Sequence, residues 1–150
     1  MEPPAYGVNV PELSRGDFEN LLAFRTSLRR FLNWSQHHAR AAGLTPGQHQ
    51  LLVAIKGHPH NGSPAISDLA GYLLLRHHSV VELVDRAAAG GLVERRADTQ
   101  DGRLTRVRLT ASGQARLASL TPAHLGELRA LAPALDRLVD LWAAETRHQA

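Results

Sequence analysis

The sequence predicts a mainly helical α+β fold, in which several helices accompany one β-hairpin. Leu and Ala supply most of the apolar side chains, which favours helices over strands. Apolar residues recur at a spacing near 3.6 along most of the 150 residues. Only between Leu92 and Thr110 does this spacing fall to two, as expected for strands. The length fits one compact domain.

The composition excludes several classes of protein. A hydrophobic fraction of 43% with 21% charged residues argues against a largely disordered chain. The absence of Cys excludes disulfide scaffolds, Cys-ligated zinc and thiol redox switching. An aromatic fraction of 5% argues against a protein that stacks single-stranded bases on many rings. No segment reads as a signal peptide or a membrane span, so we expect a cytoplasmic protein.

The N-terminal third predicts an arm and two helices. The segment Met1–Leu13 holds three Pro and one Gly and is typical of a loose arm. A long helix is predicted over 17–41, with Gly43 as its stop signal. The tetrapeptide Thr45-Pro46-Gly47-Gln48 combines a capping box with Pro at the first helical position, and predicts a second helix that ends near Gly57.

Two short helices should follow, separated by a tight turn. After a loop over 58–62, the pair Ser63-Pro64 repeats the cap-then-Pro signal for a helix that ends near Leu73. The next helix is expected over 77–89, ended by Gly90-Gly91. Ser79 and Glu82 also fit a capping box, in which case this helix begins two residues later.

A basic hairpin and two or more helices complete the chain. Strands are predicted over 93–96 and 104–109, joined by a polar turn over 97–103. Between Leu92 and Thr110 stand five arginines, namely Arg95, Arg96, Arg103, Arg106 and Arg108. A helix should begin after Thr110 and either kink or restart at Thr121-Pro122, and Pro133 should separate two helices.

Two short helices, a tight turn and a basic hairpin together indicate a winged helix–turn–helix. The second helix can enter the major groove of double-stranded DNA, with its N-terminal residues near the base edges. The candidate contacts of this recognition helix are Arg76, His77, His78, Ser79 and Glu82. The candidate contacts of the hairpin, or wing, are Arg103 at its tip, Arg106 and Arg96, since Arg suits a narrow minor groove. Asp98 and Asp101 are expected to orient the wing, because phosphate repels carboxylates.

Several motifs in this order resemble the MarR-type winged-helix transcriptional regulators. They are Ile66-Ser67-Asp68-Leu69-Ala70, Ser79-Val80-Val81-Glu82-Leu83-Val84-Asp85-Arg86, Gly91-Leu92-Val93-Glu94-Arg95, Asp98-Thr99-Gln100-Asp101-Gly102-Arg103 and Leu109-Thr110-Ala111-Ser112-Gly113. The chain departs from the family pattern at Arg76, where a small capping residue is common, and at His77-His78, where basic or hydroxyl residues are more typical. These departures affect which bases would be recognised.

The resemblance implies a fold and a function. It implies one domain over 1–150, with dimerisation helices over 1–43 and 111–150 and a winged helix–turn–helix lobe over 44–110. It implies a homodimer that binds a pseudo-palindromic operator, usually as a repressor, and a small-molecule cleft between the two lobes. We expect a small aromatic or anionic effector, with Trp34, His38 and His49 as candidate cleft residues, although such a Trp is more often dimer core.

Other functions find less support in the sequence. It holds no Gly-rich phosphate loop, no G-x-S-x-G or H-E-x-x-H motif and no Cys nucleophile, so we expect no enzyme. Adjacent His residues on a helix point about 100° apart and chelate poorly, so we expect neither a metal nor another cofactor. A winged helix that binds protein and no DNA is the alternative, and the polar outer face of the second helix argues against it.

Overall fold

The computed structural model describes residues 12–147, which fall into two compact units. Of the described residues, the terminal unit comprises 12–32 and 127–147, and the winged unit comprises Asn33–Gly126. The expected N-terminal arm lies almost wholly outside the described residues. The winged unit is longer at both ends than the lobe expected over 44–110, since it also includes residues 33–43 and 111–126.

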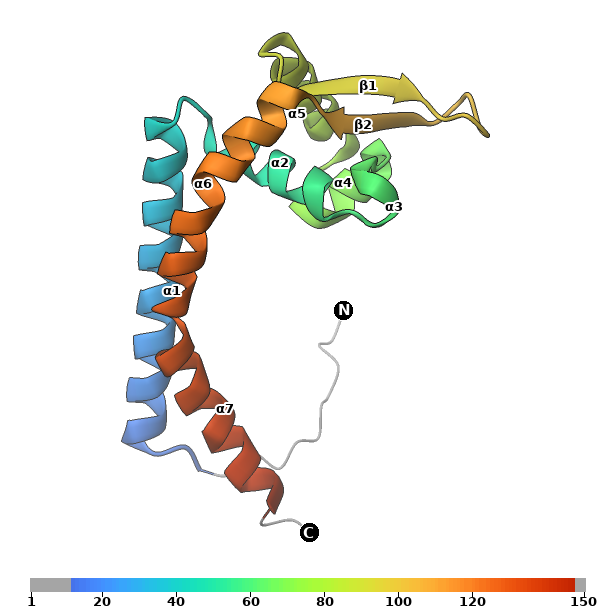
Figure 1. Cartoon of the computed structure of the whole chain (residues 1–150). Coiled ribbons are helices and arrows are strands. Elements are labelled where there is room, and N and C mark those ends of the chain that lie inside the picture. The colour runs from blue at the N-terminus through green and yellow to red at the C-terminus, as the bar shows by residue number, and fades with distance from the viewer. Residues whose placement is uncertain (1–11, 148–150) are drawn as a thin grey trace. The chain divides into compact units, whose positions relative to one another are not determined.

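The element order confirms the mainly helical fold with one hairpin (Figure 1). The elements are α1 (Arg15–Ala41), α2 (Pro46–Gly57), α3 (Pro59–Gly62), α4 (Ile66–Leu73), α5 (His77–Ala89), β1 (Val93–Ala97), β2 (Thr105–Leu109), α6 (Ala111–Arg129) and α7 (Ala132–Arg147). The two strands are antiparallel, and their hairpin extends away from the helices of the winged unit.

The capping box predicted at the start of α2 is present. The Gln48 N–H donates to the Thr45 hydroxyl oxygen at 3.1 Å, and the Thr45 N–H donates to the Gln48 side-chain oxygen at 3.1 Å. Two backbone donors that the helix itself leaves unpaired are therefore satisfied. This cap fixes the point at which the chain enters the winged unit's core.

The segment before α4 differs from the expectation. Instead of a loop over 58–62, one helical turn, α3, begins at Pro59 and ends at Gly62, which has a φ of +63°. Helix α4 begins at Ile66 rather than after Ser63, because the Pro64 carbonyl accepts a hydrogen bond from the Val107 N–H at 2.9 Å. This bond keeps the chain extended alongside β2 for longer than the cap-then-Pro signal suggested.

The structure decides two points that the sequence left open in the later helices: α5 takes the earlier start, and the expected restart at Thr121-Pro122 is wrong. Helix α5 begins at His77, so the later start at Ser79 is wrong, and no side chain caps it. Helix α6 runs through Pro122 without a break, whereas Pro133 lies in the first turn of α7, where its missing N–H costs no helical hydrogen bond. Pro133 therefore accompanies the expected boundary between two helices.

The core of the winged unit is apolar and contributed by several elements. Fully buried side chains come from α2, α4, α5 and β2, and the largest are Leu51, Leu52, Ile55, Leu69, Val80, Val84 and Val107. In β2, the alternation places Val107 in this core while Arg106 and Arg108 remain partly exposed. The hairpin is thereby held on the helices through the face that carries Val107.

Gly113 lies where α6 passes closest to the start of the wing. A Cβ at this position would lie 2.0 Å from the Leu92 carbonyl oxygen. The same oxygen accepts a hydrogen bond from the Thr110 N–H at 3.1 Å. The Thr110 hydroxyl in turn donates to the Gly91 carbonyl at 2.6 Å and accepts from the Gly113 N–H at 3.0 Å. Only glycine allows this close approach.

The terminal unit carries several large apolar side chains that remain exposed in the single chain. Phe18 and Leu22 lie one turn apart on α1 and are 56% and 63% exposed. Leu135 and Val139 lie one turn apart on α7 and are also exposed. Apolar stripes at this spacing are typical of helices that pack against another surface.

Candidate nucleic-acid interface

The recognition helix α5 presents polar and cationic side chains at its N-terminal end. Arg76, His77 and His78 are exposed, and within residues 12–147 none of the three forms an ion pair. Ser79 is half-buried, and Glu82 is exposed and pairs with Arg86 at 3.7 Å along the helix. The Arg76 guanidinium and the imidazoles of His77 and His78 are therefore available to a partner.

Arg95 attaches the wing to the recognition helix. Its guanidinium lies 2.5 Å from the Asp85 carboxylate and 3.4 Å from the Val81 carbonyl oxygen, both on α5. The positive charge of Arg95 is thus used within the fold. The pair also fixes the base of β1 against the helix that would enter the major groove.

Arg96 and Arg108 share one carboxylate within the hairpin. Glu94 accepts a hydrogen bond from Arg108 on the opposite strand and pairs with Arg96 at 3.5 Å. The hydrogen bond from Arg108 is the main cause that lowers the pKa of Glu94 below its ordinary value, and the charges of both arginines add to it. Glu94 therefore remains ionised and neutralises part of the wing's positive charge.

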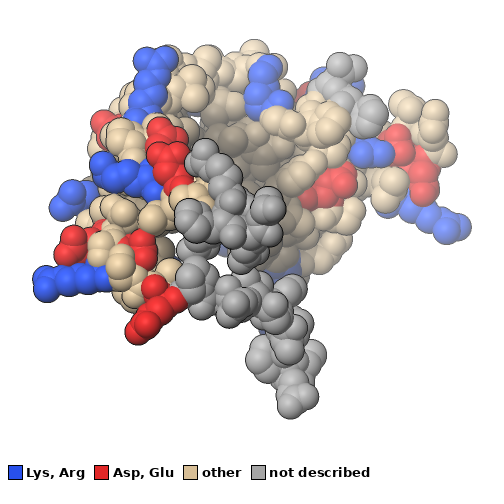
Figure 2. All heavy atoms as spheres, turned by 90° about the horizontal axis from the view of Figure 1, so that it is seen from below, with Lys and Arg blue, Asp and Glu red and all other residues tan. Residues whose placement is uncertain are grey.

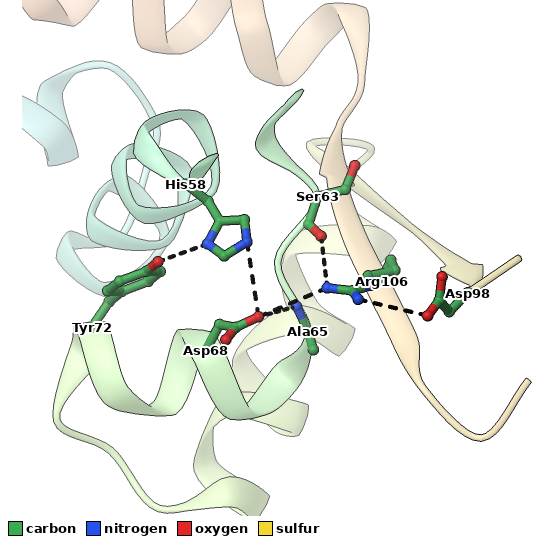
Figure 3. A network of polar contacts seen from close by, with 7 residues as sticks. All are labelled: His58, Ser63, Ala65, Asp68, Tyr72, Asp98 and Arg106. Atoms are coloured by element: carbon green, nitrogen blue, oxygen red, sulfur yellow. Dashed lines mark hydrogen bonds and ion pairs between the residues drawn. The ribbon is translucent and has the colours of Figure 1, made fainter. Parts of the chain in front are cut away.

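Arg106 lies in a network that links the wing to α4 (Figure 3). Its guanidinium lies 3.6 Å from the Asp98 carboxylate, 3.9 Å from the Asp68 carboxylate and 3.4 Å from the Ser63 carbonyl oxygen. On the other side of Asp68, His58 Nε2 lies 3.9 Å from the same carboxylate oxygen. The side chain of Arg106 is only 33% exposed.

Arg103 differs from the other four arginines of the wing. It is exposed in the turn, and over the described part of the chain its guanidinium forms no ion pair. Its backbone N–H donates to the Asp101 carboxylate at 3.0 Å, and the Leu104 N–H donates to the Asp101 carbonyl at 3.0 Å. Asp101 thus shapes the turn through the backbone and leaves the Arg103 guanidinium available.

The recognition helix and the wing border one concave surface. A cavity of about 350 Å³ lies between α4, α5 and the wing, and His77, Arg95 and Arg103 are among its lining residues. Over the face drawn in Figure 2, basic and acidic side chains are interspersed and do not gather into a patch of one sign. Because the net charge of +3 is small, any attraction of the concave surface for an anion depends on the cations that line it, such as Arg103.

The candidate effector residues Trp34, His38 and His49 lie in one aromatic cluster of the winged unit. The rings of Trp34 and His38 are stacked with their centroids 4.8 Å apart. His124, which the sequence did not single out, lies at the centre of the cluster, with ring centroids 4.8 Å from Trp34, 5.4 Å from His38 and 4.5 Å from His49. The spacing of His124 from Leu117 and Leu120 on α6 was the signal that could have placed it on a buried face.

Hydrogen bonds fix the tautomer of His124, and burial lowers the pKa of His49. The two ring nitrogens of His124 contact the Leu120 carbonyl oxygen at 2.9 Å and the Ser35 hydroxyl at 2.8 Å. Since a carbonyl can only accept, Nδ1 of His124 carries the proton. Burial is the main cause that lowers the pKa of His49, and the neighbouring His124 and His38 lower it further. His49 therefore favours its neutral form.

Between residues 12 and 147, no group of three or more His, Cys, Asp or Glu side chains is arranged to hold a metal ion. In the same range, every helix is either too short or too polar to cross a lipid bilayer.

The fold and the site define a winged helix–turn–helix protein with a recognition helix and a basic wing. A sequence model of the MarR family matches residues 42–104, which include the helix–turn–helix and most of the wing. This segment, 63 of the 150 residues, is similar to the MarR family.

Several known proteins are similar to most of the chain. The HTH-type transcriptional repressor YetL of Bacillus subtilis (strain 168) is 27% identical over 120 residues, which cover 79% of this chain and 71% of YetL. The structure of AbsC, a MarR family transcriptional regulator from Streptomyces coelicolor, matches with a TM-score of 0.68 at 18% identity, over 93% of this chain and 99% of AbsC. BpsR of Bordetella bronchiseptica, whose DNA binding is regulated by 6-hydroxynicotinic acid, matches with a TM-score of 0.62 at 19% identity, over 87% of this chain and 98% of BpsR.

Proposed function

We propose that this protein is a MarR family transcriptional regulator, a homodimer that binds a pseudo-palindromic DNA operator and represses transcription until a small molecule releases it. The observation that carries the DNA-binding part is the distribution of charge in the wing. Four of its five arginines are paired with carboxylates of the chain, whereas the guanidinium of Arg103 at the tip is exposed and has no such partner among residues 12–147.

The proposed mode of binding uses two elements of the winged unit. The exposed side chains of Arg76, His77 and His78, with Ser79 and Glu82 behind them, enter the major groove at the N-terminal end of α5. Arg103 reaches the neighbouring minor groove, where the negative potential attracts guanidinium groups. Arg96, which is 60% exposed despite its pair with Glu94, adds a contact to the backbone.

The exposed apolar stripes of the terminal unit support the proposed homodimer. Phe18 and Leu22 on α1, and Leu135 and Val139 on α7, are side chains that a single chain leaves in water. Burying them against a second copy stabilises the dimer by about 25 cal/mol per Å² of apolar area. The dimer then sets the distance between two recognition helices, which enter successive major grooves.

The aromatic cluster supports the proposed effector response. Trp34 and His38 are half-buried rings beside the buried His49 and His124, and flat aromatic surfaces of this kind bind aromatic ligands. A small aromatic acid is the proposed class, which agrees with the 6-hydroxynicotinic acid named for BpsR. Such a ligand releases DNA only if it binds better to the conformation with low DNA affinity.

The charge reversal Arg103→Glu tests the DNA-binding mode. Fluorescence anisotropy against the DNA upstream of the protein's own gene, measured at several salt concentrations, should show a loss of about 30-fold or more, because one phosphate contact per subunit is replaced by repulsion. The matched control Arg25→Glu reverses an exposed arginine of α1 and should leave the affinity nearly unchanged. If Arg103→Glu binds DNA as tightly as the control, the proposed binding mode is wrong. If the wild-type dimer binds no DNA, the mode is also wrong, and a winged helix that binds protein is favoured instead.

A further inference from the structure

We propose that Arg106 is a positioning residue that clamps the wing to α4, and not a DNA contact as its place on a basic strand suggests. This inference rests on the proposed function, because it assigns how the wing is held for Arg103. Its basis is that Arg106 joins Asp98 in the wing to Asp68 in α4 (Figure 3).

The clamp connects three segments that are distant in sequence. Asp98 follows the end of β1, and its backbone N–H donates to the Leu104 carbonyl at 2.9 Å, so it is part of the wing's turn. Asp68 lies in the first turn of α4, the first helix of the helix–turn–helix. Arg106 therefore bridges the wing and the helix pair through its two terminal nitrogens, and its contact with the Ser63 carbonyl adds the segment before α4.

Asp68 is held in place from the other side. The same carboxylate oxygen that faces Arg106 accepts a hydrogen bond from the Ala65 N–H at 2.9 Å and lies 3.9 Å from His58 Nε2. His58 in turn shares a hydrogen bond of 2.7 Å with the Tyr72 hydroxyl at the other end of α4. Because Asp68 has these other partners, it stays in place when the wing moves. Its attraction for Arg106 therefore limits the motion of the wing.

The backbone supports the same interpretation. Ala65 forms an isolated antiparallel bridge with Arg106, and the Val107 N–H donates to the Pro64 carbonyl at 2.9 Å. These contacts hold the middle of β2 against residues 64–65, so the side chain of Arg106 acts at the point where the wing leaves the helices. The two carboxylates neutralise the charge of the Arg106 guanidinium and so reduce its attraction for a phosphate, and the Ser63 carbonyl accepts one of its hydrogen bonds.

A clamp and a phosphate contact predict different effects of removing an acid. If Arg106 contacted DNA, then Asp98→Asn would leave DNA binding unchanged or strengthen it, because a negative charge near phosphates is removed. If Arg106 is a clamp, Asp98→Asn should weaken DNA binding as Arg106→Gln does. We expect a loss of about twofold to thirtyfold for each, because both wings of the dimer lose a partly exposed ion pair.

A second measurement does not require DNA. Because the chain has no Cys, a single Thr99→Cys substitution places one nitroxide label on the exposed wing of each subunit. In the free protein, Arg106→Gln and Asp98→Asn should increase the mobility of this label in the electron paramagnetic resonance spectrum. The matched control is Arg103→Gln, because the guanidinium of Arg103 forms no ion pair within residues 12–147. This variant should weaken DNA binding and leave the mobility of the label unchanged.

The outcomes separate the clamp from the proposed function. Increased label mobility in Arg106→Gln and Asp98→Asn, with both variants still folded and dimeric, supports the clamp even if no operator is found. Unchanged mobility in both variants overturns it. A salt dependence reduced by about one ion per subunit in Arg106→Gln, without weaker binding in Asp98→Asn, also overturns the clamp and assigns Arg106 to a phosphate.

Discussion

The substitution Gly113→Ala should strongly destabilise the protein, although alanine is the better helix former. An added Cβ would lie 2.0 Å from the Leu92 carbonyl oxygen and 3.0 Å from the Leu92 carbonyl carbon. Ordinary carbon–oxygen contacts lie at about 3.3 Å or more, so α6 and the start of the wing must separate by roughly 1 Å. Both groups belong to the backbone, so no side-chain rotation can relieve the clash.

The structure gives the size of the effect. Overpacking of this kind costs about 1–3 kcal/mol. The displacement also weakens the hydrogen bonds from the Thr110 N–H to the Leu92 carbonyl and from the Thr110 hydroxyl to the Gly91 carbonyl, each worth about 1 kcal/mol. The gain in helix propensity offsets about 1 kcal/mol. We therefore expect a net loss of about 2–4 kcal/mol.

Thermal unfolding of the dimer at one fixed protein concentration checks this prediction. A loss of about 2–4 kcal/mol corresponds to a Tm lowered by roughly 4–16 °C for a chain of this size. The control Gly126→Ala lies in the same helix, where an added Cβ meets no heavy atom within 4 Å, and should raise the stability or leave it unchanged. If Gly113→Ala is as stable as Gly126→Ala, the close approach of α6 to Leu92 is not as the structure shows it.

Two further predictions concern the cap of α2 and the histidine cluster. Thr45→Ala removes the side-chain half of the capping box and should lower the free energy of unfolding by about 1 kcal/mol, which urea unfolding measures; Thr99→Ala, in the exposed turn, should change it little. The lowered pKa of His49 means that the unfolded chain binds this proton more readily than the folded chain. Stability should therefore be complete above about pH 6.5 and should fall as the pH is lowered below that value. His49→Gln should reduce this pH dependence, whereas the exposed His77→Gln should not, and an unchanged slope in His49→Gln would contradict the assigned cause.

The helix boundaries that depend on local chemistry could be predicted from the sequence. The capping box at Thr45 and the change of period after Gly91 act within a few residues, so their consequences are visible without the fold. Helix α4 starts later than its local signal because a contact from β2, more than forty residues away in sequence, holds the Pro64 carbonyl. Neighbouring residues alone cannot predict where a helix starts when its start signal competes with such a tertiary hydrogen bond.

The candidate site shows the same division. The alternation along β2 correctly placed Val107 in the core and Arg106 with Arg108 on the other face. It could not show that their carboxylate partners differ, because Glu94 is set by strand register and Asp68 by the packing of α4. Likewise, Trp34 and His49 were plausible neighbours from the sequence, but the central position of His124 depends on how α6 packs inside the winged unit.

These pairings change what the charge of the protein means for its function. The net charge of +3 suggests a weak general attraction for DNA, and the internal pairs of the wing weaken it further, because four of five arginines already have carboxylate partners. In the proposed complex, long-range attraction between the protein's charge and the DNA then contributes little affinity. Most of the affinity must come from two groups that contact the DNA at defined positions, Arg103 in the wing and Arg76 before α5. Their separation is fixed by the internal pairs, since Arg95 holds β1 on α5 and Arg106 holds β2 toward α4. The paired arginines thus contribute to binding through geometry, which is why removing the acid Asp98 should weaken DNA binding although it makes the protein more positive.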